Sequence, residues 1–216
     1  MAVRADLTKA AQLTPEQWQW VDSPQAGVSR VMLDRVGDEV AIATSFVRYA
    51  EGSTFPTHQH ALGEEFLVLE GEFGDEHARY PACTYVRNPA GTSHAPFSEP
   101  GCLIWVKLRQ FDLNDQAQFA TLLDTAIPAA GHQERLLHEF GTERVREVVA
   151  GSGEVLTFGD TGEVEEVLVL EGCLEHEGEQ LPVWSWLRLP AGRVEQVKVV
   201  EAARVFVKTR PVYERD

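Results

Sequence analysis

Residues 58–71 read HQHALGEEFLVLEG, and this stretch decides the fold class. His58 and His60 stand two positions apart. On a β-strand both side chains therefore point to one face and can reach one ion, whereas on a helix they diverge. The apolar run 66–69 then ends at Gly71, which is typical of a buried strand closed by a turn. The stretch predicts β-structure that carries a pair of metal ligands.

A third histidine follows a turn signal. Residues 89–94 read PAGTSH, in which Pro89 and Gly91 favour a tight turn before His94. We expect this turn to open a second strand pair that returns His94 to the pocket of the first two histidines. Three imidazoles and one carboxylate with β-compatible spacing are the ligand set of a metal site.

Two adjacent glutamates compete for the carboxylate position. The number of residues to Gly71 favours Glu64, and Glu65 then faces away from the pocket. His77 lies in a predicted polar turn, and we expect it in solvent. No residues for an organic cofactor are predicted. The predicted metal ligands are His58, His60, Glu64 and His94.

The two blocks around these ligands resemble the two cupin motifs. The four ligands fall on the metal-ligand positions of those motifs, and the turn residues fall on their turn positions. Two places depart from the pattern: Cys83 stands where the second motif usually begins with Gly, and Ser98 stands where it usually ends with Asn. The resemblance implies a double-stranded β-helix, or jelly roll.

The wider sequence is similar to that of the ChrR-like cupins. The similarity rests on the segments GEEFLVLEG (63–71), RNP (87–89), HAPF (94–97) and VKL (106–108). This group includes the sensor domain of zinc-containing anti-sigma factors, and its sequences are similar to those of acetylacetone-cleaving dioxygenases.

An internal repeat sets the domain organisation. Residues 64–110 align with residues 165–211 at a constant offset and without a gap, and 16 of the 47 aligned pairs are identical. The chain therefore resembles a bicupin. We predict an all-β fold of two tandem cupin domains with a short N-terminal helix.

The predicted domain limits follow from the repeat. They are an N-terminal extension (1–20), a metal-binding cupin (21–112), a linker (113–131) and a degenerate cupin (132–216). The sequence TPEQ at 14–17 has an N-cap, a proline at the first helical position and a capping-box Gln, so it predicts a short helix through Trp20. A weak helical pattern marks residues 111–131 as the linker.

The second copy lacks the histidines of the first, which align with Gly159, Thr161 and Glu195. Only Glu165 remains of the four ligands, and two carboxylates without an imidazole make a poor site for a transition metal. We therefore expect one metal ion per chain. Glu165 and Glu195 either face each other as a general acid/base pair or each pair with an arginine. The candidate arginines are Arg188, Arg193 and Arg204.

Composition agrees with two small cores and limits the partners. The chain has 216 residues, 44% of them hydrophobic and 25% charged, and a formal net charge of −15 at pH 7. This charge repels phosphate groups, so we expect neither nucleic acid nor a membrane as partner. The N-terminus lacks the apolar core of a signal peptide, and no apolar stretch approaches the roughly 20 residues of a membrane span. We expect a cytoplasmic protein.

The run 66–69 also concerns assembly. It is apolar on both strand faces, so its outer face needs cover from the other domain or from a second subunit. This pattern favours a homodimer.

The ligand set defines the chemistry. Three imidazoles and a carboxylate leave one or two positions open on a five- or six-coordinate ion, where water, dioxygen or a bidentate small molecule binds. Fe(II) suits oxygenation of a chelating substrate such as a β-diketone, whereas Zn(II) suits binding, hydrolysis or a structural role. The metal stays open among divalent first-row ions, with Fe or Zn expected first and Mn or Ni as alternatives.

Residues outside the ligand set give softer expectations. Arg48, on the strand before the histidine pair, is the candidate for holding an anionic substrate or enolate, and a salt bridge is its alternative role. The candidates for the cavity wall are Phe66, Val68, Phe97 and Trp105.

Two functional classes stay open. The first is a mononuclear metal-dependent oxygenase, such as a dioxygenase, that acts on a small chelating or oxygenated molecule. The second is a non-catalytic sensor cupin that regulates transcription through a protein partner such as a sigma factor. In the anti-sigma proteins the cupin follows a zinc-binding helical domain with a His and a Cys-x-x-Cys, and neither motif precedes the cupin here. We therefore expect the oxygenase.

Overall fold

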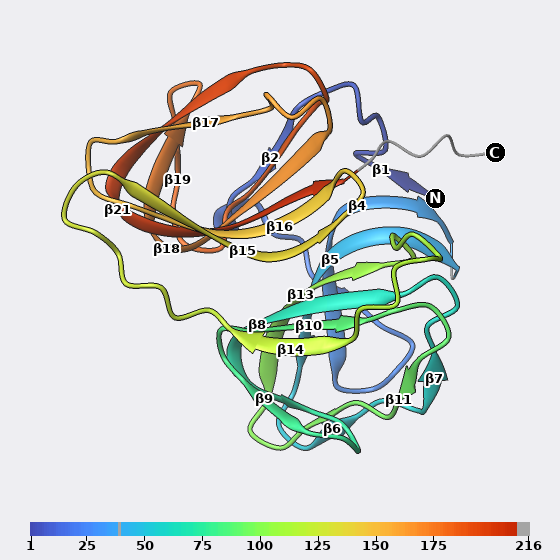
Figure 1. Cartoon of the computed structure of the whole chain (residues 1–216). Coiled ribbons are helices and arrows are strands. Elements are labelled where there is room, and N and C mark those ends of the chain that lie inside the picture. Colours follow the sequence, from blue (N-terminus) through green and yellow to red (C-terminus); the bar gives the residue numbers. More distant parts are fainter. Residues whose placement is uncertain (39, 211–216) are drawn as a thin grey trace. The chain divides into compact units, whose positions relative to one another are not determined.

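The computed structural model describes residues 1–38 and 40–210, and the chain divides into two compact units. Unit 1 comprises Met1–Ala5 and Gln19–Asp124, and unit 2 comprises Asp6–Trp18 and Thr125–Asp216. Both are built from β-strands (Figure 1), so the predicted all-β fold is confirmed. The end of the predicted degenerate cupin, 211–216, lies outside the described residues. The described part of the chain holds no helix long and apolar enough to cross a membrane.

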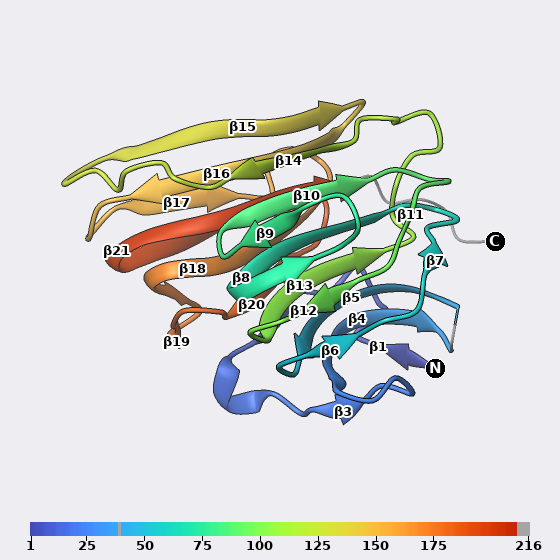
Figure 2. The same ribbon diagram turned by 90° about the horizontal axis from the view of Figure 1, so that it is seen from below.

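Unit 1 contains an antiparallel sheet whose strands follow the order β1-β4-β5-β13-β8-β10-β14. Its long strands are β4 (Val28–Gly37), β5 (Ala41–Tyr49), β8 (Glu64–Gly74), β10 (Thr84–Asn88) and β13 (Cys102–Leu108). Its short strands are β1 (Ala2–Val3), β3 (Val21–Asp22), β6 (Ser53–Thr54), β9 (Arg79–Pro81), β12 (Phe97–Ser98) and β14 (Phe119–Leu122). A separate pair, β7 (His58–Gln59) and β11 (Ser93–His94), lies at one end of these strands (Figure 2).

Side-chain alternation on the central strands builds the core of unit 1. Register places Phe66 of β8 opposite Val106 of β13, and Val68 opposite Ile104. All four are buried in one hydrophobic cluster. Leu67 points to the opposite face and is also fully buried within the single chain. Side chains on both faces of the apolar run of β8 are therefore buried, and the predicted homodimer stays a prediction.

Unit 2 contains an antiparallel sheet in the order β15-β16-β21-β18-β20-β2, with β17 on β21 and β19 on β18. Its strands are β2 (Ala11–Leu13), β15 (His132–Phe140), β16 (Glu143–Ala150), β17 (Val155–Phe158), β18 (Val164–His176), β19 (Glu179–Leu181), β20 (Trp186–Leu189) and β21 (Glu195–Arg210). Its interior is a cluster of buried aliphatic side chains from six of these strands, together with Phe158.

The strand register repeats between the units at the offset seen in the sequence. In unit 1, Trp105 lies opposite Leu67 on the β13–β8 ladder. In unit 2, the aligned residue Phe206 lies opposite Leu168 on the β21–β18 ladder. The sequence repeat is thus a repeat of strand pairing.

Two aligned glycines stand where the backbone allows no side chain. Gly71 has φ 72°, and a Cβ there would lie 2.0 Å from the carbonyl oxygen of Gly101. Gly172 has φ 76°, and its Cβ would lie 2.2 Å from the carbonyl oxygen of Ala202. Only glycine accepts both the left-handed conformation and the close approach of the neighbouring strand. Gly71, the last residue of the segment 58–71, is therefore required by the fold.

The N-terminal helix is shorter than predicted. A 3₁₀ turn, η1, spans Pro15–Gln17, and the Gln17 side chain accepts a hydrogen bond from the backbone N–H of Thr14 at 2.9 Å. Trp18 then adopts an extended conformation, with φ −65° and ψ 132°. The predicted start signals are correct, but a single turn replaces the helix through Trp20.

The segments flanking the long strands become strands themselves. Ala11–Leu13 (β2) pairs with β20 of unit 2, with Leu13 opposite Trp186. The weak helical pattern predicted for the linker was wrong. Phe119–Leu122 (β14) is a strand that pairs with β10, with Phe119 opposite Arg87. Backbone pairing at a free sheet edge outweighs so weak a helical preference. The predicted domain limits themselves remain a prediction.

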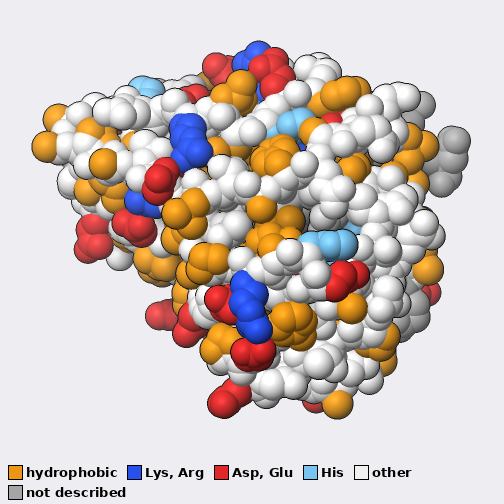
Figure 3. All heavy atoms as spheres, turned by 60° about the horizontal axis from the view of Figure 1, so that its bottom comes forward, with side chains coloured by type: hydrophobic (Ala, Val, Ile, Leu, Met, Phe, Trp, Pro, Cys, Tyr) orange, Lys and Arg blue, Asp and Glu red, His pale blue; other side chains and the backbone are white. Residues whose placement is uncertain are grey.

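On the face shown in Figure 3, lysine and arginine side chains lie beside acidic ones. Among the described ion pairs, Arg79 pairs with Glu72 at 3.1 Å and with Glu99 at 2.6 Å. The described residues on this face therefore form no continuous basic surface.

Candidate metal centre

The short β7–β11 pair brings two predicted ligands face to face. His94 is the register partner of His58 on this antiparallel ladder. His60 follows β7 directly, and its backbone is fixed by hydrogen bonds to Thr92 and from Gly91, both 2.8 Å long. Glu64 is the first residue of β8. The turn predicted before His94 therefore returns the third histidine to the first two.

The four side chains converge on one point. The ring centroids of the three histidines lie 4.6 to 5.0 Å from one another. Oε1 of Glu64 lies 3.2 Å from Nε2 of His94 and 3.5 Å from Nε2 of His60, and its Oε2 lies 3.9 Å from Nε2 of His58. One donor atom from each of the four lies within 4.8 Å of every other.

The other ring nitrogen of each histidine faces a hydrogen-bond acceptor. Nδ1 of His58 lies 3.1 Å from the carbonyl oxygen of Pro56, and Nδ1 of His94 lies 3.3 Å from Oδ2 of Asp75. Nδ1 of His60 lies 3.0 Å from the hydroxyl of Thr92. That hydroxyl donates to the carbonyl of Pro89, so its oxygen accepts from His60. Each Nδ1 thus faces an oxygen atom, and Nε2 is the ring nitrogen that each histidine turns to the centre.

The donor set fits a metal ion by a second observation. Nε2 of His60 is buried and has no hydrogen-bond partner among the described residues. A buried imidazole nitrogen without a partner is costly, and a metal ion satisfies it. The shared orientation of the three rings and the unpartnered nitrogen of His60 therefore make this cluster a candidate metal centre.

Burial and mutual contacts shift the pKa values of three residues of the cluster, two of them down and one of them up. Burial lowers the pKa of His60 to about 4, so this ring is neutral near pH 7. Burial alone would also lower the pKa of His94, but its contacts with Asp75 and Glu64 raise it to about 9. Burial alone would raise the pKa of Glu64, but its contacts with His58 and His94 hold it below its usual range. The cluster is thus arranged around an ionised carboxylate.

Glu65 faces away from the cluster, as strand alternation requires. It is fully buried, and its Oε2 accepts hydrogen bonds from the hydroxyl of Tyr85 at 2.5 Å and from Arg87 at 3.3 Å. Arg87 also pairs with Asp115 at 2.5 Å. The two adjacent glutamates therefore serve different networks. His77, expected in solvent, has a side chain that is 62% exposed.

A cavity of about 540 Å³ opens beside the cluster. All four candidate ligands line it, together with apolar side chains of the core such as Val47, Phe73 and Ile104. Three arginines also line it, namely Arg30, Arg35 and Arg109. A small molecule can therefore lie against both apolar wall and candidate ligands.

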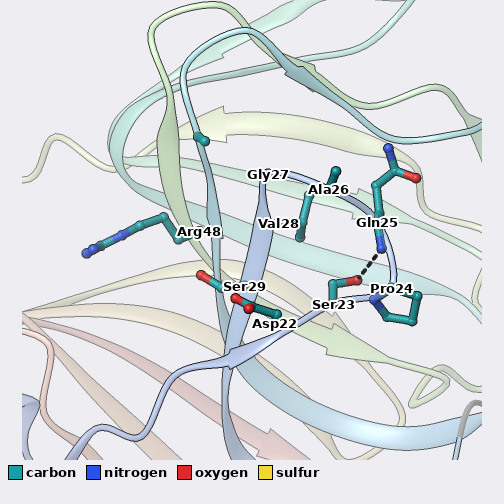
Figure 4. Close-up of a pocket in the computed structure, with 10 residues that line it drawn as sticks. Asp22, Ser23, Pro24, Gln25, Ala26, Gly27, Val28, Ser29 and Arg48 are labelled. Carbon is teal, nitrogen blue, oxygen red and sulfur yellow. Dashed lines mark hydrogen bonds between the residues drawn. The ribbon is translucent and has the colours of Figure 1, made fainter.

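Arg48 is not among the residues brought to the cluster. Its side chain is exposed, and its guanidinium carbon lies 4.6 Å from the ring centroid of Trp20. It borders a separate hollow of about 440 Å³ at residues 22–29, which join β3 to β4, and its side chain extends away from these residues (Figure 4). The residues expected to form the cavity wall are absent from the described lining as well. They are Phe66, Val68, Phe97 and Trp105.

The aligned position in unit 2 is closed by its backbone and by a salt bridge. A Cβ on Gly159, which aligns with His58, would lie 1.9 Å from the carbonyl oxygen of Arg193. Glu165 is fully buried, pairs with Arg146 at 2.6 Å and accepts a hydrogen bond from the backbone N–H of Gly159. Arg146 was not among the arginines expected for this role.

Glu195 also takes an arginine partner. It pairs with Arg193, and its Oε2 lies 3.6 Å from Nε2 of His176. His176, Glu177 and Glu195 lie close enough to hold a cation, but Arg193 pairs with both glutamates. The contacts in unit 2 therefore follow the arginine-paired alternative.

Three partners of the histidines were missed in the sequence. Asp75 stands in a polar turn, Thr92 inside the PAGTSH segment and Pro56 two residues before His58. None carries a spacing signal of its own, because each role depends on where the turn places one oxygen atom.

Comparison with known proteins shows what this chain is similar to. Residues 8–112 match the family model of the ChrR cupin-like domain. The solved bacterial pirin YhhW from Escherichia coli, in complex with nickel(II), is similar with a TM-score of 0.70 and 14% identity, over 94% of this chain and 100% of that one. A proposed dioxygenase from Nostoc punctiforme is similar with a TM-score of 0.73 and 12% identity, over 97% of this chain and 85% of that one. No curated protein sequence matches the chain. These likenesses confirm the cupin fold.

Proposed function

We propose that the protein is a mononuclear metal-dependent oxygenase acting on a small chelating or oxygenated molecule, because residues 8–112 match the family model of the ChrR cupin-like domain. The proposed metal ligands are His58, His60, Glu64 and His94. The observation that carries the proposal is the convergence of three Nε2 atoms and one carboxylate, with every Nδ1 facing an acceptor.

The donor set supports a divalent first-row ion. Neutral imidazoles and a carboxylate suit Fe, Zn, Ni and Mn, and four protein ligands leave open positions on a five- or six-coordinate ion. When bound, such an ion supplies a Lewis acid and, in the case of iron, a redox centre for dioxygen chemistry. We propose one ion per chain, with Fe or Zn expected first. The nickel in the solved pirin supports the choice of a divalent first-row ion. The name of the dioxygenase from Nostoc punctiforme supports dioxygen chemistry.

The chain's own residues position the reactants. Asp75 and Thr92 orient two of the ligand rings through their Nδ1 atoms. His58 is the most exposed of the ligands, with 33% of its side chain accessible. The apolar cavity wall excludes water around a bound molecule, which strengthens its polar contacts with the centre.

A sensor cupin is the second candidate, because the matched family is named for the ChrR cupin. In that role the same cavity would bind a metal or a small molecule without turnover and change the affinity for a protein partner such as a sigma factor. A cytoplasmic homodimer without nucleic-acid or membrane partners completes the proposal. Size-exclusion chromatography with light scattering tests its assembly.

Identification of the native metal and an oxygen-uptake assay test the function. Protein reconstituted anaerobically with Fe(II) should consume O₂ when a small β-diketone or enol is added. The double variant His58→Ala/His60→Ala should consume none. Native zinc together with no oxygen uptake across a broad substrate panel would overturn the oxygenase and favour the sensor.

A further inference from the structure

The cavity beside the candidate centre is positively lined in a strongly acidic chain. The chain has 34 acidic and 19 basic residues, yet the described lining holds Arg30, Arg35 and Arg109 and only one carboxylate, Glu64. Glu64 is itself turned into the histidine cluster. Glu64 is therefore the one carboxylate among the described lining residues, beside three arginines.

Arg30 reaches the cavity from β4. Its register partner on β5 is Val47, and the partner of Val47 on β13 is Ile104. Both of these neighbours line the cavity, so Arg30 lies in a row of side chains that faces it. Arg48 follows Val47 on β5 and has the opposite direction, which explains why it lies outside.

The guanidinium of Arg30 has no ion-pair partner among the described residues. Its Nε is buried and makes no hydrogen bond there. Arg35, by contrast, donates to the carbonyl oxygen of Asp38. A buried donor without a partner is costly in the free protein, and that cost is recovered when an anion binds.

Arg109 is a second arginine of the cavity wall that could contact a bound anion. It is a non-glycine residue with φ 62°, held in this conformation by a hydrogen bond of 2.9 Å from its backbone N–H to Gly63. No ion pair of its side chain occurs in the described structure. Backbone strain of this kind is common at functional sites, and here the strained residue is one that lines the cavity.

We infer that the molecule bound in this cavity carries a carboxylate, held by Arg30 with Arg109 as a second contact, while its chelating end faces the four candidate ligands. The inference rests on the proposed function for the chelating end. An arginine fork holds a carboxylate by two parallel hydrogen bonds, and a neutral ester cannot reproduce them. The ligand class is therefore a small oxo or dioxo carboxylic acid, as opposed to a neutral diketone.

A matched pair of probes tests the inference by binding. 2,4-Dioxopentanoate and its methyl ester share a diketone and differ by one charge. Calorimetric titration of Zn(II)-loaded protein should show the acid binding about tenfold or more tightly than the ester. In Arg30→Gln this preference should be lost, and in the control Arg48→Gln it should be kept. Arg30→Lys keeps the charge without the fork and should show an intermediate preference.

Each outcome has a distinct meaning. Equal affinities for acid and ester, or no binding of either by metal-loaded protein, would overturn the inference. A preference that persists in Arg30→Gln would also overturn it, because the metal would then hold the carboxylate. Elemental analysis separates this inference from the proposed function: protein that binds no metal refutes the function, whereas metal-loaded protein without the preference refutes only the carboxylate.

Discussion

Nδ1 of His94 lies 3.3 Å from Oδ2 of Asp75, which is itself buried. The carboxylate fixes the ring so that Nε2 points at the centre, and its negative charge increases the basicity of that nitrogen. Oδ1 of the same aspartate accepts hydrogen bonds from the backbone N–H groups of His77 and Ala78. One side chain thus holds its turn and orients a proposed metal ligand.

Asp75→Asn should weaken metal binding by about tenfold to a hundredfold. The amide oxygen can keep the turn contacts, but the amide nitrogen then places a donor against the Nδ1–H of His94. Competition with a chelating dye measures the affinity. His77→Gln, a change of an exposed neighbour, is the control, and an equal loss in both variants would contradict the role of Asp75.

Metal should reside only in unit 1. Elemental analysis of the purified protein should give near one equivalent per chain, because only unit 1 offers three imidazoles. His58→Ala/His60→Ala should remove the metal, whereas Glu195→Ala should not. Two equivalents per chain would contradict this prediction.

Substitution of each of the two adjacent glutamates should affect a different property, metal binding for Glu64 and stability for Glu65. Glu64→Gln should lose metal, because it removes the only carboxylate in the cluster. Glu65→Gln should keep metal but lower the free energy of unfolding by up to about 3 kcal/mol, since it weakens a buried pair with Arg87. Chemical denaturation and metal analysis read out the two effects. The opposite pattern would shift the register of β8 by one residue.

Gly71→Ala should destabilise the protein far more than Gly52→Ala. The two glycines have nearly the same φ, 72° and 71°, so each variant incurs about 1 to 2 kcal/mol of left-handed strain. A Cβ on Gly52 has nothing within 4 Å, whereas one on Gly71 collides with the carbonyl of Gly101. The collision should add about 1 to 3 kcal/mol, measurable by denaturation. Equal losses would show that the strand relaxes around the methyl group.

Introducing histidines into unit 2 at the three positions that align with those of unit 1 should be tolerated at two positions and destabilising at the third. Thr161→His/Glu195→His adds two imidazoles, but Gly159→His forces a side chain into the carbonyl of Arg193. The triple variant should therefore lose thermal stability relative to the double variant. A stable triple variant with a second metal equivalent would disprove the backbone constraint.

The ligands of the candidate centre were predictable because they depend on local rules. His58 and His60 obey strand alternation, and the turn before His94 is written in Pro89 and Gly91. The choice of Glu64 over Glu65 needed only the same alternation. Such rules act over a few residues, so one sequence is enough to apply them.

The rest of the site depends on contacts distant in sequence. Arg30 lines the cavity because β4 pairs with β5 and β5 with β13, an order that no motif announces. Arg48 shares the strand before the histidines but faces the other way, toward Trp20. Ala11–Leu13 carries no strand signal and becomes a strand because β20 offers it a free edge.

Unit 2 shows that this arrangement of strands can form without a set of metal ligands. Its strands keep the register of unit 1, while Gly159 and the arginine pairs occupy the place of the ligands. The sheet therefore forms from apolar packing and backbone pairing alone. By the same logic, removal of any bound metal by a chelator should leave unit 1 folded, so the supply of metal should change the metal content of the protein and not the abundance of the folded chain.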